Sequence, residues 1–199
     1  GCLRRPAQRR PGQRPPGVDS AAHRIAGCHA GTICLTPMPA ASPHLFVDIS
    51  SHGFGHLAQA APILNALCQH QPELRLTVRC GLAPEKLRSR LKGNFTHLPG
   101  SSDFGYVMLD AVSIDFTATA EKYRAMHADW ALRVSDEAEL LDHLHADLVL
   151  TDVAYLPLAG AARAGIPSLS MCSLNWADLF VHFFGHEPWA PPIHREILA

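Results

Sequence analysis

Two histidines and two glycines stand close together in SSHGFGHLAQAAP, residues 50–62. Such a cluster could hold a metal, cradle a phosphate, supply a catalytic acid or base, or only form a turn. The apolar run 44–50, typical of a buried strand, ends here, and apolar residues at helical spacing follow. The pattern therefore predicts a strand-to-helix loop, where backbone N–H groups and the positive end of a helix dipole can approach an anion or a sugar hydroxyl.

A metal site and a dinucleotide fingerprint are the first two alternatives. His52 and His56 are four residues apart, as two ligands on one helical face would be, but the glycines between them disfavour a helix and no third ligand is evident. GFGHLA fits the fingerprint GxGxxG/A, yet Arg79 and Cys80 stand where its acidic residue is expected. We therefore expect no metal and no bound cofactor. A plain turn, with the histidines capping it, stays open at this point.

A second loop strengthens the catalytic interpretation. Asp152 follows the apolar run 146–152, the fourth strand expected along the chain. In an open parallel sheet of order 3-2-1-4-5, the loops after strands one and four open onto the same crevice. His56 and Asp152 are therefore predicted to face each other, as a carboxylate does when it orients an imidazole that acts as general base. Alternatively, Asp152 is only the N-cap of the next helix.

From His44 onward the chain alternates strand-like and helix-like segments, so the predicted fold class is α/β, a Rossmann-like doubly wound parallel sheet. The first helix is expected to begin near Gln59, because this start places Pro62 in its first turn. Past Asn175, the aromatic residues and prolines suggest an irregular, lid-like segment. The expected strands are 44–50, 74–80, 95–99, 146–152 and 167–173, and the other expected helices are 84–91, 119–145 and 156–165.

Composition excludes several classes of protein. The chain has 199 residues, 47% of them hydrophobic, and no apolar run near the roughly 20 residues that span a bilayer. Residues 1–40 carry six arginines against one acid, which leaves the remainder acidic and argues against nucleic-acid binding. The six cysteines are scattered without a CxxC pair, which fits a reducing compartment, and we expect a cytoplasmic protein.

Two domains of unequal character are expected. Residues 1–40 form an Arg- and Pro-rich arm without periodicity, for which we expect disorder. Met38 stands just before the first strand, so one hypothesis is that translation begins there and that residues 1–37 are upstream sequence. Residues 41–199 form the Rossmann-like domain.

Three stretches together resemble a known family. They are ISSHGFGHLAQAAPILNAL, DFGYVMLDAVSIDF and LTDVAYLPLAGAARAGIPSLSMCSLNWADLF, from about residue 44 to the end of the chain. HGFGH after the first strand resembles the N-terminal half of GT-B glycosyltransferases. The wider pattern is similar to the glycosyltransferase-like region of plant L-arabinokinases and their bacterial relatives. DFG at 103–105 is not a kinase signature, because no HRD loop precedes it, and it falls in a connection expected to be variable.

The resemblance implies roles for particular residues. It makes His56 the base that activates an acceptor hydroxyl and Asp152 its partner. Gly53 and Gly55 match the family's glycine loop. Together with Ser51 and His52 they are expected to bind the substrate, and three weaker candidates for lining the crevice are Asn175, Trp176 and Asp178. A nucleotide sugar is implied as co-substrate, with a small molecule or glycan as acceptor.

The resemblance covers only half of such an enzyme. GT-B enzymes place the donor mainly in a second, C-terminal Rossmann-like domain, and this sequence ends near the point where that domain should begin. We therefore expect the acceptor-binding half of a glycosyltransferase, a fragment inactive alone or one that needs a separate donor-binding partner. Half of a nucleotide-sugar epimerase and a non-catalytic sugar-binding or regulatory module are the two alternatives.

Overall fold

The structure, a computed structural model, describes residues 42–199. The expectations for the arm 1–40 and for Met38 thus lie outside the described residues. Five strands form one parallel sheet in the order β3-β2-β1-β4-β5, as the sequence predicts. The strands are β1 (His44–Asp48), β2 (Arg75–Cys80), β3 (Thr96–Pro99), β4 (Leu148–Thr151) and β5 (Ser168–Ser170). The predicted Rossmann-like α/β class is confirmed.

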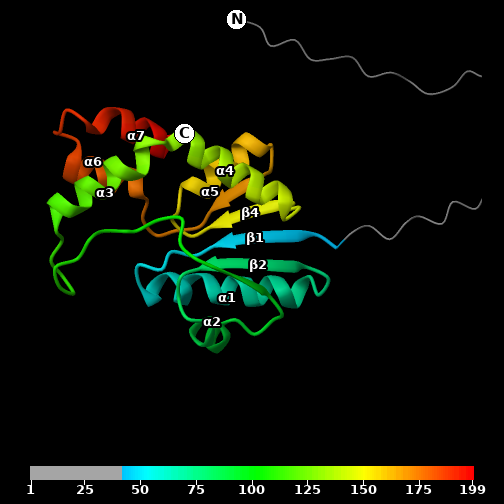
Figure 1. Cartoon of the computed structure of the whole chain (residues 1–199). Coiled ribbons are helices and arrows are strands. Elements are labelled where there is room, and N and C mark those ends of the chain that lie inside the picture. The colour runs from blue at the N-terminus through cyan, green and yellow to red at the C-terminus, as the bar shows by residue number, and fades with distance from the viewer. Residues whose placement is uncertain (1–41) are drawn as a thin grey trace, which may run out of the picture. The chain divides into compact units, whose positions relative to one another are not determined.

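Within residues 42–199, seven helices cover this sheet and extend beyond it (Figure 1). Helices α1 and α2 lie on one face, and α4 and α5 lie on the other. Helices α3, α6 and α7 pack together beyond the carboxyl ends of the strands. Their bounds are α1 (Phe54–His70), α2 (Pro84–Arg90), α3 (Phe116–Ala128), α4 (Trp130–His143), α5 (Leu156–Ala164), α6 (Trp176–Phe184) and α7 (Ala190–Leu198).

The side chains of β1 alternate between two apolar cores. Leu45 and Val47 point into the core beneath α1 and α2, whereas Phe46 packs against α4 and α5. This alternation follows from the period of two in a strand, and both faces are apolar because helices cover both. A third cluster, rich in aromatic side chains, joins α3, α6 and α7 to the loop that follows β4.

Two expectations about the helices are wrong. Helix α1 begins at Phe54 rather than near Gln59, so Pro62 lies inside it. Pro62 and Ala58 are both exposed, so water can reach the carbonyl that the missing N–H leaves without a partner. The helix expected over 119–145 is two helices, which break at Asp129. The break redirects the chain, because α3 packs into the aromatic cluster and α4 packs onto the sheet.

The segment past Asn175 is also ordered differently from the expectation. It forms two helices, α6 and α7, rather than an irregular lid. The Asn175 side chain caps α6 by accepting a hydrogen bond from the Asp178 backbone N–H. Pro191 falls in the first turn of α7, where a missing N–H costs no helical hydrogen bond. Within residues 42–199, no helix is both long and apolar enough to cross a bilayer.

Candidate active site

The histidine-glycine stretch connects β1 to α1 at the carboxyl end of the sheet (Figure 1). Gly53 is the N-cap of α1, so His56 stands in the first turn of the helix. No side chain caps this end of α1, and its first turn holds no acidic residue. The first N–H groups of the helix are therefore left for another acceptor, beside the positive end of the helix dipole.

His56 and Asp152 meet across the β1–β4 junction, as the strand order predicts. The His56 Nδ1 atom lies 2.5 Å from the Asp152 Oδ2 atom, and Asp152 is 3% exposed. The other carboxylate oxygen, Oδ1, accepts hydrogen bonds from the backbone N–H groups of Ser50 and Val153, at 3.0 and 2.7 Å. Asp152 is thus held by backbone on one side and turned toward the imidazole on the other.

This contact sets the electrostatics of His56. The hydrogen bond that the imidazole donates to Asp152 raises the pKa of His56 above its ordinary 6.5, although partial burial opposes the rise. The negative charges of Asp152 and Asp103 raise this pKa further. Because Nδ1 is committed to Asp152, Nε2 is the nitrogen that can accept a proton from a ligand. Within residues 42–199, no group donates to or accepts from Nε2 in a hydrogen bond.

Asp103 also reaches this site, although the sequence places it in a variable connection between β3 and α3. Its carboxylate accepts hydrogen bonds from the Ser50 hydroxyl at 3.1 Å and from the Trp176 indole N–H at 3.1 Å. The signal that could have revealed it is positional: Asp103 follows β3 at the same sheet edge where His56 follows β1.

The remaining predicted residues differ in what their side chains contact. Trp176 is buried, and its ring lies edge-on to the ring of His52, with centroids 6.3 Å apart. Asn175 and Asp178 are exposed and mainly bind each other: the Asn175 Nδ2 atom donates to Asp178 Oδ2 at 2.7 Å, in addition to the helix cap. The hydroxyl of Ser51 accepts a hydrogen bond from the Gly81 backbone N–H at 2.6 Å, which joins the loops after β1 and β2.

The two histidines of the loop face different partners. His56 contacts Asp152, whereas His52 contacts Trp176 and packs against Gly105. Residues 42–199 hold no group of three or more His, Cys, Asp or Glu side chains arranged to bind a metal ion.

The glycines of the loop are not needed for its backbone shape. Gly53 has an extended φ of −170°, and Gly55 lies inside α1. A Cβ added at either position would meet no atom within 4 Å. Open space therefore lies above both glycines, where the backbone can be approached closely.

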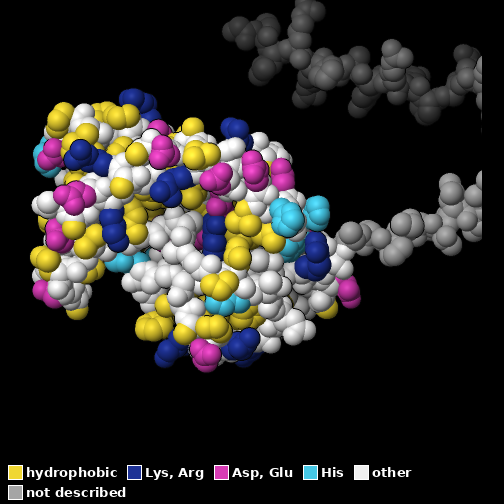
Figure 2. Space-filling view, viewed as in Figure 1, with side chains coloured by type: hydrophobic (Ala, Val, Ile, Leu, Met, Phe, Trp, Pro, Cys, Tyr) yellow, Lys and Arg dark blue, Asp and Glu magenta, His cyan; other side chains and the backbone are white. Residues whose placement is uncertain are grey.

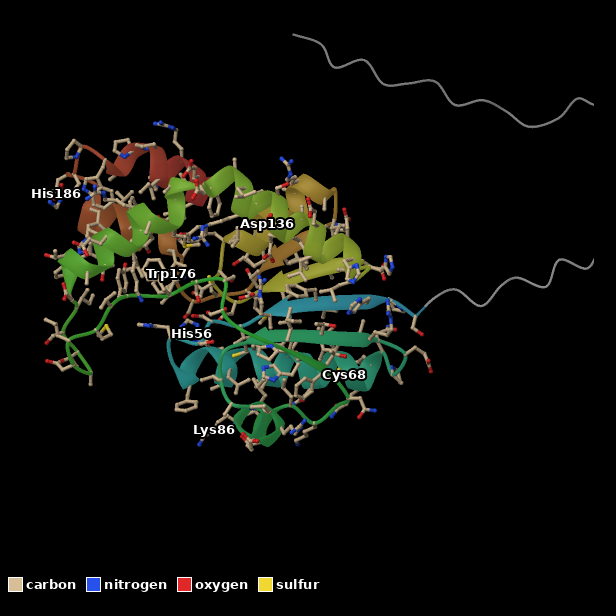
Figure 3. The ribbon with its side chains drawn as sticks, in the orientation of Figure 1. His56, Cys68, Lys86, Asp136, Trp176 and His186 are labelled. Carbon is tan, nitrogen blue, oxygen red and sulfur yellow. The ribbon has the colours of Figure 1, made fainter. Side chains whose placement is uncertain are left out.

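The site opens into a hollow of the molecular surface. Figure 2 shows the molecule indented between the part built from α1 and α2 and the part built from α3, α6 and α7. Figure 3 shows His56 and Trp176 from these two parts, at the end of the sheet toward which the strands point. We call this hollow the cleft.

A buried ionic network joins β1, β2 and α4 next to the site. Arg79, in β2, pairs with Asp48 at the end of β1 and donates to both carboxylate oxygens of Glu137 in α4, at 2.7 and 2.8 Å. All three side chains are buried. Burial raises the pKa of Asp48 to about 6, although the adjacent Arg79 charge opposes the rise. Arg79, whose position argues against a dinucleotide fingerprint, thus has a structural partner on each side.

Comparison with known proteins gives one similarity at the level of sequence. Over 150 residues the chain is 27% identical to L-arabinokinase of Arabidopsis thaliana, a match that covers 72% of this chain and 14% of that protein. The chain thus spans about one seventh of the length of this curated relative. No model of a known protein family matches the chain.

Solved structures with a similar arrangement include two glycosyltransferases. The glycosyltransferase of kitacinnamycin has a TM-score of 0.49 and 15% identity, over 77% of this chain and 38% of that one. CalG4, the calicheamicin glycosyltransferase, has a TM-score of 0.48 and 17% identity, over 78% and 41%. At these scores the likeness carries no argument about activity, which has to come from the site itself.

Proposed function

We propose that residues 42–199 are the acceptor-binding part of an enzyme that transfers a sugar from a nucleotide-sugar donor, with His56 as general base. The observation that carries the proposal is the contact between His56 and Asp152. A buried carboxylate on Nδ1 fixes the tautomer and orientation of the ring, and it stabilises the imidazolium that forms when Nε2 takes a proton.

The surroundings of His56 suit this chemistry. Its raised pKa makes the imidazole a stronger base than a free histidine. An acceptor hydroxyl placed at Nε2 would be deprotonated as its oxygen attacks the anomeric carbon from the face opposite the leaving nucleotide. The configuration at that carbon would therefore be inverted.

The start of α1 supplies a second binding element. Its uncapped N–H groups, with open space above Gly53 and Gly55, suit oxygens of the acceptor or of the donor's pyrophosphate. We infer that a second domain holds the rest of the donor and closes the cleft, as the similarity to a much longer relative suggests. Residues 42–199 alone are then expected to give no measurable transfer.

The test is acceptor-dependent transfer by the protein that the complete reading frame encodes, assayed with a panel of UDP- and GDP-sugars. His56→Ala should lower kcat by about two to four powers of ten, the usual effect of losing a general base, with little change in donor binding. His70→Ala is the matched control, because His70 is an exposed histidine at the far end of the same helix and should leave kcat unchanged. Unchanged turnover in His56→Ala, or epimerisation of the donor without transfer, would contradict the proposal.

A further inference from the structure

The carboxylate of Asp103 is a junction between three segments of the chain. Its Oδ1 atom accepts hydrogen bonds from the hydroxyls of Ser101, at 3.0 Å, and Ser50, at 3.1 Å. Its Oδ2 atom accepts one from the indole N–H of Trp176, the first residue of α6. These donors lie in its own loop, in the loop after β1 and in the C-terminal helical part, segments that are distant in the sequence.

Ser50 links this junction directly to the proposed base. It is fully buried, its backbone N–H donates to Asp152, and its hydroxyl donates to Asp103. The same hydroxyl accepts a hydrogen bond of 3.3 Å from the backbone N–H of His52. One buried serine thus joins the two carboxylates that act on His56, because the fields of Asp152 and Asp103 both reach the imidazole.

The other arm of the junction holds Trp176, the first residue of α6. Trp176 is 4% exposed, and its ring contacts both His52, edge-on, and Tyr106, with centroids 5.4 Å apart. The segment that carries Asp103 is itself anchored, since the hydroxyl of Ser102 donates to Asp48 at 3.0 Å. The indole therefore cannot move away from His52 without breaking its hydrogen bond to Asp103. The Asp103 carboxylate is itself held by the hydroxyls of Ser50 and Ser101.

We propose that Asp103 is a positioning residue of the site, which ties Trp176, at the start of α6, to the loop of His56 and places a second fixed negative charge near the imidazole. This inference rests on the proposed function, because that function makes His56 the base of the site. The arrangement around Asp103 can nevertheless be tested without an activity assay. Two effects are involved, one of charge and one of position, and they can be separated by two substitutions.

Asp103→Asn removes the charge and keeps the shape, including an oxygen that can accept from the indole. Trp176→Phe keeps an aromatic ring and the charge of Asp103, but removes the indole N–H. The charge effect is read from the pH titration of the His56 ring by NMR in the 199-residue protein, with the signal assigned by its loss in His56→Ala. The charged groups that act on this ring among the described residues are Asp152 and Asp103.

Asp103→Asn should lower the pKa of His56, because it removes a negative charge that favours the protonated ring. Trp176→Phe should leave that pKa in place and change the ring signals of His52, because the aromatic ring beside it is smaller and no longer held by the hydrogen bond to Asp103. If Asp103→Asn does not fold, Asp103→Ser provides the same test, since it also removes the carboxylate charge and keeps a short polar side chain. A folded Asp103→Asn or Asp103→Ser protein with an unchanged His56 titration would overturn the inference.

Kinetics of the complete enzyme distinguish this inference from the proposed function. Asp103→Asn should reduce kcat/KM on the order of 10- to 100-fold, the scale expected when a catalytic group loses its positioning partners. Absence of transfer in the wild type, together with a shifted His56 titration in Asp103→Asn, would refute the function and support the positioning role. Transfer in the wild type with kcat/KM unchanged in Asp103→Asn would refute the positioning role alone.

Discussion

Replacing Arg79 by methionine should destabilise the domain severely. The guanidinium is 10% exposed and lies between the carboxylates of Asp48 and Glu137, which are 0% and 5% exposed. Methionine keeps much of the volume of the side chain but leaves two buried carboxylates without their cationic partner. Breaking a buried ion pair in this way costs about 3–5 kcal/mol in the free energy of unfolding. For a domain of this size the loss corresponds to a fall in Tm of roughly 6–20 °C.

The cost should also depend on pH, with a definite sign. The pKa of Asp48 is already raised to about 6, so the folded protein favours the protonated acid and stability from this group is lost as pH rises through 6. Removing Arg79 takes away the charge that opposes this rise. The destabilisation by Arg79→Met should therefore be larger at pH 8 than at pH 5, where Asp48 is protonated.

Urea unfolding followed by circular dichroism at pH 5 and pH 8 measures both effects. Arg75→Met is the matched control, because Arg75 lies at the exposed start of the same strand and its loss should cost no more than about 0.5 kcal/mol. A loss below 1 kcal/mol in Arg79→Met, or one equal to that of Arg75→Met, would refute the account of the buried network.

Three further predictions concern stability. Gly160→Ala should cost about 1–3 kcal/mol in the free energy of unfolding, because a Cβ there would lie 2.5 Å from the Glu137 side chain, and equal urea midpoints for variant and wild type would contradict this packing. Gly55→Ala should keep or raise Tm, since the position is helical with open space for a Cβ, yet weaken substrate binding if the backbone is approached there; a marked fall in Tm would show that the glycine is structural. Asp152→Asn should destabilise the protein more at pH 6 than at pH 9 in urea unfolding. The raised pKa of His56 in the folded protein stabilises the fold below pH 6.5, and this contribution is lost as pH rises through that folded-state pKa. An equal loss at both pH values would count against the pairing of His56 with Asp152.

Strand order and the meeting of His56 with Asp152 could be predicted from the sequence, because both follow from the alternation of apolar runs and the rule for open parallel sheets. The start of α1 could not be predicted, because the rule that a proline belongs in the first turn of a helix does not take into account that Pro62 faces water. The break at Asp129 depends on two helices packing against different partners, which periodicity does not record.

The contacts of Asp103 and of Arg79 could not be predicted from the sequence for a different reason. The place of Asp103 after β3 puts it at the same sheet edge as His56, but in this irregular connection between β3 and α3 spacing does not predict which groups its side chain contacts. Arg79 occupies a strand position without any nearby acid in the sequence, and its partners Asp48 and Glu137 are 31 and 58 residues away. Such contacts between distant segments become visible only when the sheet and its covering helices are assembled.

The central claim, that His56 is the base and Asp152 its orienting partner, is tested most directly by the pH dependence of kcat/KM in the complete enzyme. The wild-type rate should rise through a pKa above 6.5, since the free base must be present and its pKa is raised by Asp152. In Asp152→Asn this limb should move to lower pH and the maximal rate should fall. An identical limb in wild type and Asp152→Asn, or one that persists in His56→Ala, would contradict the account.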